Sequence, residues 1–237
     1  MLATGFSWYV SIIQIPQRYQ HVNETSATRA GILLLPLTLI SPVFAMLAGT
    51  LVGKFPTSAA PLTLTGTCLN LVGMGLMSSL PTGTRIVKGQ FGYQVVIGAG
   101  LGFIMPPLLY LLKVEVKDST LASAMGAINM ARTLGGCIGL AICSSLLHAR
   151  LDADLSKFLT PEQIQATTSS NFELGLLTED DRRRVSKVYG ESYDLQFRVM
   201  MAFAAVNILA AGTLWWAVWR KNKSVDKASD TETGEQK

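Results

Sequence analysis

The first apolar segment of the chain carries a stripe of side chains that can donate and accept hydrogen bonds. Thr4, Ser7, Ser11, Gln14 and Arg18 follow one another at spacings of three or four residues. In a helix this spacing places all five on one face, and such a face avoids lipid. The stripe predicts either one wall of a water-filled path or a set of hydrogen bonds to neighbouring helices. Arg18 stands at the edge of the segment, where its long side chain can reach the membrane surface.

A second candidate is Arg132, which lies well inside the apolar segment 121–148 and has Asn129 one turn before it. A guanidinium at this depth needs an internal partner, and by default it marks a functional site. We expect that partner to be a helix carbonyl, a polar side chain such as Gln14 or Asn207, water, a substrate or a group on another domain. The alternative is a structural arginine that is satisfied by carbonyls or reaches the cytoplasmic interface. The candidate substrate-path residues are Ser7, Ser11, Gln14, Arg18, Asn129, Arg132 and Asn207.

The other reactive side chains form no catalytic or metal-binding pattern. His21 and His148 are far apart in the sequence, and the three cysteines have neither metal-ligand spacing nor a disulfide framework. No nucleophile, metal cluster or carboxylate pair lies at a suitable depth, so the sequence predicts no enzyme activity, no metal site and no cofactor. Nucleic-acid binding is also excluded, because the basic residues gather at the ends of apolar segments, where membrane orientation uses them.

The composition of the chain indicates that these residues lie in a membrane. Of its 237 residues, 49% are hydrophobic and only 15% are charged, which is too apolar for an ordinary soluble domain. Six runs have the roughly 20 residues that a bilayer-spanning helix needs, and none contains Asp or Glu. We therefore predict an all-α, polytopic membrane protein with the lipid bilayer as a partner. The six predicted transmembrane helices are residues 2–19, 31–53, 61–80, 91–112, 121–148 and 197–219.

Two glycine clusters predict close contacts between helix backbones, because a helix without side chains on one face can approach its neighbour closely. The cluster in the fourth span does not have the GxGxxG spacing and follows no strand, which excludes a dinucleotide-binding loop. The helix-packing residues are Gly98, Gly100 and Gly102 in the fourth span and Gly135, Gly136 and Gly139 in the fifth.

Basic residues and tryptophans predict the orientation and the boundaries of the chain. Lys54 follows the second span, Lys113 follows the fourth, and a basic tail follows the sixth, so these three ends and the C-terminus should be cytoplasmic. Trp215, Trp216 and Trp219 should form an interfacial anchor before that tail.

The predicted domains follow from the same pattern. Residues 1–148 hold the first five transmembrane helices, and 197–219 form the sixth. Residues 149–196 form an extracytoplasmic loop, in which capping patterns at Thr160 and Thr178 predict short helices. Residues 220–237 are too polar to bury a core and should form a disordered cytoplasmic tail.

Several motifs in this order resemble a known family. Ile15-Pro-Gln-Arg-Tyr-Gln20 followed by Ala30-Gly-Ile-Leu-Leu-Leu-Pro36 is similar to the signature that opens the last six helices of fungal fourteen-helix drug and toxin exporters of the major facilitator superfamily. Gly49-Thr-Leu-Val-Gly53-Lys54 resembles the second copy of the cytoplasmic loop motif of that superfamily. Arg132-Thr-Leu-Gly-Gly136-Cys-Ile-Gly139 resembles the glycine-rich penultimate helix, and Val188-Tyr-Gly-Glu-Ser-Tyr193 the lead-in to the last.

The resemblance implies one bundle of the major-facilitator type, the C-terminal six-helix half of a proton-driven exporter of small hydrophobic organic compounds such as drugs or toxins. It implies the plasma membrane as the location, with the vacuolar or another internal membrane as the alternative. The partner would be the missing N-terminal helical bundle, and the chain is expected to be truncated. Because alternating access needs two bundles, we expect the chain alone not to perform proton antiport. The alternative is a six-helix partner, regulator or remnant of a transporter that does not itself transport.

Overall fold

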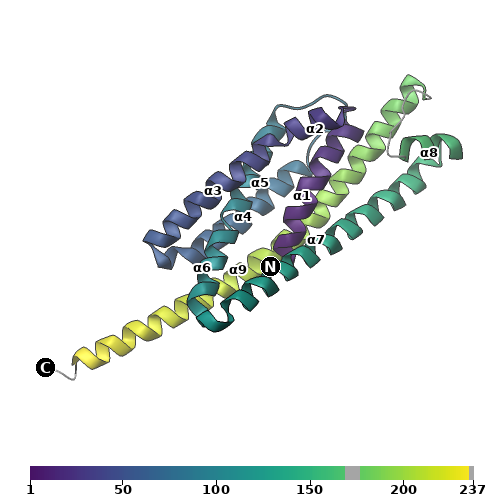
Figure 1. The fold of residues 1–237 in the computed structure, drawn as a ribbon. Coiled ribbons are helices and arrows are strands. Elements are labelled where there is room, and N and C mark those ends of the chain that lie inside the picture. The colour runs from purple at the N-terminus through teal and green to yellow at the C-terminus, as the bar shows by residue number, and fades with distance from the viewer. Residues whose placement is uncertain (169–176, 235–237) are drawn as a thin grey trace.

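The computed structural model describes residues 1–168 and 177–234, and all regular structure in these two ranges is helical (Figure 1). The long helices run roughly side by side, and both ends of the bundle carry the connecting turns. The elements are α1 (Leu2–His21), α2 (Ala27–Leu33), α3 (Leu35–Lys54), the 3-10 turn η1 (Pro56–Ser58), α4 (Ala59–Met77), α5 (Gly89–Gly102), α6 (Met105–Glu115), α7 (Asp118–Leu155), α8 (Pro161–Thr168) and α9 (Glu179–Gly234).

Prolines divide two of the membrane-length segments into two helices each. The break between α5 and α6 lies at Phe103 and Ile104, just before Pro106 and Pro107. Proline lacks the backbone N–H and disfavours helical geometry in the residue before it, so a helix ends or kinks there. The same effect separates α2 from α3 near Pro36. Each pair still forms one continuous apolar segment.

Five described segments are long and apolar enough to cross a membrane. The predicted span that is missing from these five is the first, α1, which has 20 residues but carries the polar stripe, and that stripe lowers its hydropathy. In the fold α1 lies inside the bundle, packed along α7 and α9. The five membrane-length segments are Ala27–Lys54, Pro56–Met77, Gly89–Glu115, Asp118–Leu155 and Glu179–Arg220.

The core of the bundle is built around α1. Phe6 and Val10 are fully buried, and the ring of Phe6 stacks on that of Phe203 from α9 at a centroid distance of 3.9 Å. Met74 from α4 and Ile97 from α5 belong to the same buried cluster. Apolar packing therefore joins the first helix of the chain to the last.

The segment 149–196 differs from the loop that the sequence predicts. Residues 149–155 continue α7, and α8 begins at the predicted capping box, where the backbone N–H of Thr160 donates to the side chain of Gln163 at 3.0 Å. Thr178 also caps a helix, since its Oγ1 accepts from the backbone N–H of Asp181. That helix is not short: it is the start of α9, which continues without interruption into the sixth predicted span. Residues 169–176 lie outside the described part.

The early start of α9 has a physical cause in its sequence. Val185, Tyr189 and Tyr193 recur every four residues and are all buried, so they form an apolar stripe on one helical face. The hydroxyl of Ser186 also donates to the carbonyl of Val22, at the end of α1, at 2.8 Å. Burial against α1 therefore extends the last helix beyond its membrane span.

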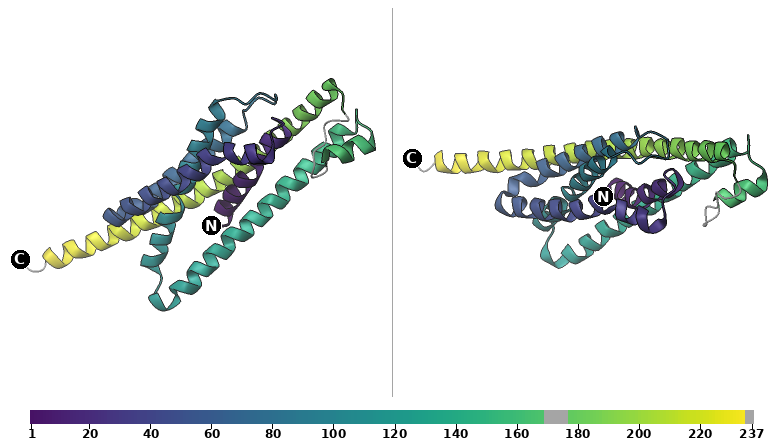
Figure 2. Two further views of the ribbon diagram at one scale, coloured as in Figure 1. Left: turned by 45° about the horizontal axis from the view of Figure 1, so that its top comes forward. Right: turned by 90° about the horizontal axis from the view of Figure 1, so that it is seen from above.

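At its other end α9 extends beyond the bundle as far as Gly234 (Figure 2). The sequence predicts a disordered tail for residues 220–237, whereas the structure describes residues 220–234 as helix. Adding a residue to an existing helix costs far less than starting a new one. The packed part of α9 therefore serves as the nucleus for this extension.

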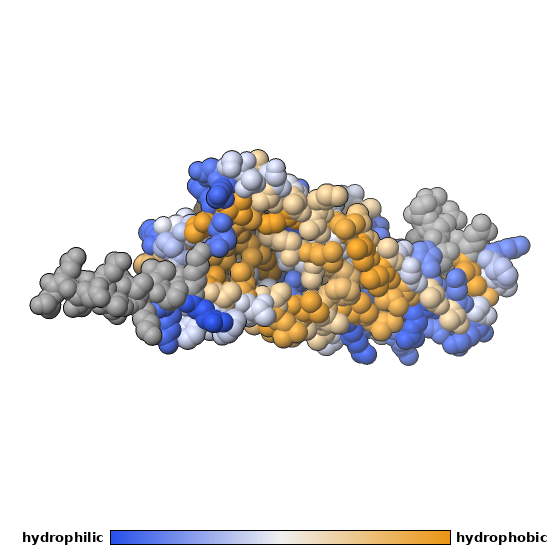
Figure 3. Space-filling model, turned by 90° about the horizontal axis from the view of Figure 1, so that it is seen from below, coloured by the Kyte–Doolittle hydropathy of each residue, from blue (hydrophilic) through white to orange (hydrophobic). Residues whose placement is uncertain are grey.

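The surface shows the pattern of a membrane protein. Figure 3 shows a broad apolar band across the middle of one face, with polar residues gathered toward the ends. Large apolar side chains point outward, including Met46 at 72% and Leu209 at 71% exposed. Contiguous exposed apolar surface of this extent is compatible with lipid as the surrounding solvent.

Candidate functional site

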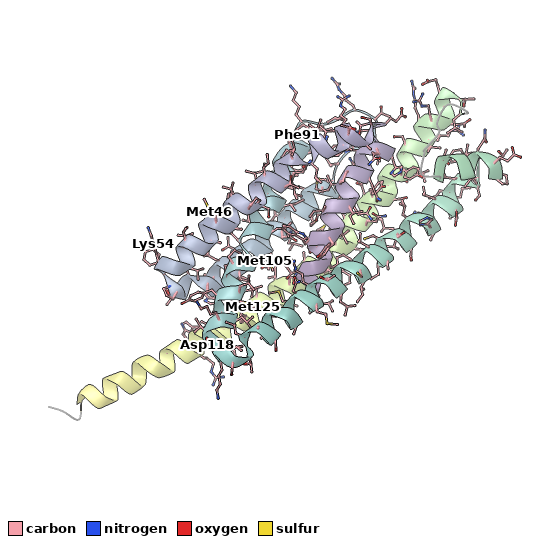
Figure 4. All side chains as sticks on the ribbon, in the orientation of Figure 1. Met46, Lys54, Phe91, Met105, Asp118 and Met125 are labelled. Carbon is pink, nitrogen blue, oxygen red and sulfur yellow. The ribbon has the colours of Figure 1, made fainter. Side chains whose placement is uncertain are left out.

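A cavity of about 470 Å³ lies between α1, α3, the α5–α6 segment and α7. Its wall is mainly apolar: Trp8 and Ile12 come from α1, Leu37 from α3 and Leu101 from α5. Met105, which is labelled in Figure 4, adds the start of α6 to the same wall. We call this space the central cavity. Its volume falls in the range of sites that hold drug-sized molecules.

Arg132 is the one charged side chain on the described wall of the central cavity. It lies 14 residues into α7, which corresponds to about 21 Å along the helix axis from Asp118. The cavity therefore has a positive charge near the middle of a membrane-length helix.

Glycines hold the backbone of Arg132 in place. A Cβ atom at Gly5 would collide with the carbonyl of Arg132, and a Cβ at Gly135 would collide with the carbonyl of Leu2. A Cβ at Gly136 would collide with the side chain of Tyr9. Two of these contacts are made by backbone atoms, so α1 and α7 cannot slide along each other here. The position of the Arg132 backbone relative to α1 is therefore fixed.

The side chain of Arg132 has few partners. Its Nη2 donates to Oδ1 of Asn129 at 3.1 Å, and the guanidinium lies 5.9 Å from the ring centroid of Tyr9. In the described ranges Nε has no hydrogen-bond partner, and no carboxylate forms an ion pair with Arg132. The predicted partners Gln14 and Asn207 are not bonded to it. The guanidinium is therefore only partly compensated.

The polar stripe of α1 faces the interior of the bundle and is almost fully buried. Ser7 and Ser11 bond to carbonyls of their own helix. Arg18 donates from Nη2 to the carbonyl of Pro81 at 3.2 Å. Thr4 donates to Oδ1 of Asn207 at 3.3 Å, on the wall of a separate cavity of about 210 Å³. The structure thus brings Arg132 and Asn129 together but leaves the stripe on another side of α1.

A further cavity of about 400 Å³ lies between the C-terminal halves of α1 and α7. Gln14 and His21 line one wall, and His148 lines the other. Gln14 is only 3% exposed, and its Oε1 has no hydrogen-bond partner in the described residues. The two histidines are distant in the sequence, and only the alignment of α1 with α7 brings them to one cavity.

An acid outside the predicted spans lies close to Arg18. The carboxylate of Asp194 interacts electrostatically with the buried Arg18 guanidinium. Asp194 was missed because the last span was predicted to begin after it. The four-residue repeat of Val185 and Tyr189, which carries the helix back through Asp194, is the signal that could have identified it.

The remaining predicted residues are glycines buried between helices and tryptophans exposed on α9. Gly98 faces the backbone of Leu37, and Gly102 faces that of Ser41, so α5 and α3 are in close contact, while Gly100 approaches Asn70 of α4. Gly139 lies against Phe6. The three tryptophans of α9 are about half exposed, and Arg220 lies over the ring of Trp216 at 4.8 Å and Lys223 over that of Trp219 at 5.0 Å. The tryptophans concerned are Trp215, Trp216 and Trp219.

The family of the chain is shown by its similarity to individual known proteins. No protein-family model matches it. It is similar to the MFS-type transporter FPY5 of Fusarium mangiferae, with 39% identity over 207 residues, which is 87% of this chain and 35% of the relative. The Efflux pump DEP3 of Fusarium langsethiae is 28% identical over 210 residues, or 85% of this chain and 37% of that protein.

The MFS-type transporter pgmG of Aspergillus terreus is 28% identical over 237 residues, which is 97% of this chain and 40% of that protein. The chain thus spans between about a third and two fifths of the length of the curated relatives it matches. This agreement along most of the sequence, together with the helical fold and its apolar surface, shows that the chain belongs to the major facilitator superfamily, whose transporters it matches in part.

Proposed function

We propose that the chain is the C-terminal six-helix half of an exporter of small hydrophobic organic compounds, and that the central cavity is its share of the substrate path. The observation that carries this proposal is the cavity itself, an apolar space of about 470 Å³ with one arginine at mid-depth. It lies among four helical segments, and a second bundle would supply the remaining walls. Such a site between two bundles allows alternating access.

The proposed partners are the lipid bilayer, the substrate and an N-terminal helical bundle. The relatives are more than twice as long as the stretch they share with this chain, so they have room for such a bundle. We place the transporter in the plasma membrane with a cytoplasmic C-terminus. This orientation is supported by the positions of Lys54 and Asp118, which lie at the end of the bundle from which the tail extends (Figure 4).

The test fills the central cavity with a larger side chain and leaves Arg132 unchanged. Ala45 and Met46 are neighbours on α3, but Ala45 lines the central cavity whereas Met46 is 72% exposed on the outer surface. In the full transporter, Ala45→Trp should lower export several-fold at unchanged expression, because the indole occupies the path. Met46→Trp is the matched control and should transport normally. Equal transport by the two variants would show that the central cavity is not part of the substrate path.

The same proposal concerns the chain by itself. Reconstituted alone in liposomes, it should show no uptake driven by a pH gradient, because rocking requires two bundles around the site. Uptake that depends on the gradient, and that Ala45→Trp abolishes, would show that the second bundle is not needed.

A further inference from the structure

We propose that the central cavity selects organic anions, and that Arg132 is the residue that determines this selectivity. The inference rests on the proposed function, since it assigns a substrate class to the same cavity. The class is an amphipathic molecule with an apolar body and one carboxylate or comparably acidic group.

The first argument is the balance of charge. Arg132 supplies a positive charge, and no acidic side chain lines the cavity in the described ranges. Arg132 is half-buried, and an ion partly removed from water gains from a partner of opposite charge, so an anionic ligand is favoured in this cavity, whereas a cationic one is repelled. Charge alone therefore distinguishes two ligands of the same size and shape.

The second argument is the supply of donors. A guanidinium has five N–H donors and no acceptor, and the bond to Asn129 uses Nη2 alone. The planar arrangement of the others suits the two oxygens of a carboxylate. The ring of Tyr9, with its centroid 5.9 Å away, limits where the guanidinium can lie. The guanidinium is thus held in position, and most of its N–H donors remain available to a ligand.

The third argument is the character of the remaining wall. Trp8, Ile12 and Leu101 offer apolar surface beside the guanidinium. Thr38 also lies on this wall, but its hydroxyl donates to the backbone carbonyls of Leu34 and Leu35, one turn before it, at 3.4 and 3.3 Å. A ligand that combines an apolar body with a single anionic group is complementary to both parts of the cavity.

The experiment compares two probes of nearly the same size and shape, one of which is charged and the other neutral. The full chain is placed in nanodiscs of phosphatidylcholine, so that no anionic lipid competes. The probes are the fluorescent carboxylate 11-(dansylamino)undecanoic acid and its neutral primary amide. We expect the carboxylate to bind at least about tenfold more tightly than the amide, as one additional charged pair would produce.

Variants identify the source of the preference. Arg132→Gln should reduce the ratio to about one while amide binding persists, which also shows that the variant folds. Arg132→Lys keeps the charge and should retain a preference for the carboxylate. Arg150→Gln is the control, because Arg150 is exposed on the same helix and its ion-pair partner among the described residues is Asp154 at 3.8 Å.

Each outcome decides between the two proposals. Equal affinities of the unmodified chain for both probes would overturn the anion selectivity and leave the cavity as a binding site. An unchanged preference for the carboxylate in Arg132→Gln would overturn the assignment of the selectivity to Arg132. Binding of both probes that Ala45→Trp does not reduce would overturn the assignment of the central cavity, and with it the proposed function.

Discussion

Arg132 and Gly135 are three residues apart on α7, and one contact with α1 positions both of them. Gly135 has Leu2 as its backbone neighbour, and the carbonyl of Arg132 lies against Gly5. Without a hydrophobic force between helices in lipid, such close backbone contacts are a main source of helix association. The packing of small residues and the placement of the charged one are therefore linked.

A pair of glycines on the same helix tests this contact. Gly135→Ala should lower stability by about 1–3 kcal/mol, because the added methyl group forces backbones apart, and the Tm of the detergent-solubilised chain should fall. Gly126 has no atom near the position of an added Cβ. Gly126→Ala is therefore the control, and it should leave the Tm unchanged or raise it slightly, since alanine is the better helix former. Equal Tm values for the two variants would argue against the α1–α7 contact.

Residue patterns predict faces of helices but not the neighbours of those faces. The spacing of Ser7, Ser11 and Gln14 correctly places them together, and all three are buried. The choice between a path and packing depends on where α3, α5 and α7 lie around α1, which no single-helix pattern contains. For the same reason Asn129 could be placed beside Arg132, one turn away, whereas the cavity wall contributed by α3 could not be foreseen.

At the scale of elements, the apolar runs predict most of the helices, and local chemistry predicts two of their starts. Thr160 and Thr178 both cap helices as their sequences indicate. The breaks before Pro36 and Pro106 follow from proline geometry, although hydropathy alone treats each segment as one run. The length of α9 was not predicted, because residues 179–196 are polar on one face and gain their helical stability from burial of the other against α1.

Hydrogen exchange distinguishes this long helix from a loop. Backbone amides of residues 185–196 should exchange at least about 100-fold more slowly than those of residues 82–88, because they are bonded within α9 and packed on α1. Residues 82–88 lie outside the helices and serve as the internal reference. Similar rates in the two segments, measured by mass spectrometry on the detergent-solubilised chain, would mean that α9 begins later than the structure shows.

At the scale of the whole molecule, helix ends that the sequence predicts to share one side of the membrane lie at the same end of the bundle. Lys54 at the end of α3 and Asp118 at the start of α7 lie at one end of the bundle, and Phe91 near the start of α5 lies at the other (Figure 4). The segments that join these two ends, Ala27–Lys54, Gly89–Glu115 and Asp118–Leu155, are each long and apolar enough to cross a bilayer. The two ends of the bundle must then face opposite sides of the membrane.

Labelling of single cysteines tests that arrangement. In a chain whose native cysteines Cys68, Cys137 and Cys143 are replaced by alanine, a membrane-impermeant maleimide is added to intact cells that express Lys54→Cys, Asp118→Cys or Lys88→Cys. All three positions are exposed in the structure. Only Lys88→Cys, next to the start of α5, should react before the cells are permeabilised, because the other two lie at the end that we propose to be cytoplasmic on the ground of the basic tail. Permeabilised cells, in which all three should react, control for accessibility. Reaction of Lys54→Cys and Lys88→Cys from the same side would contradict the bundle itself, whereas a complete reversal of the pattern would contradict only its orientation.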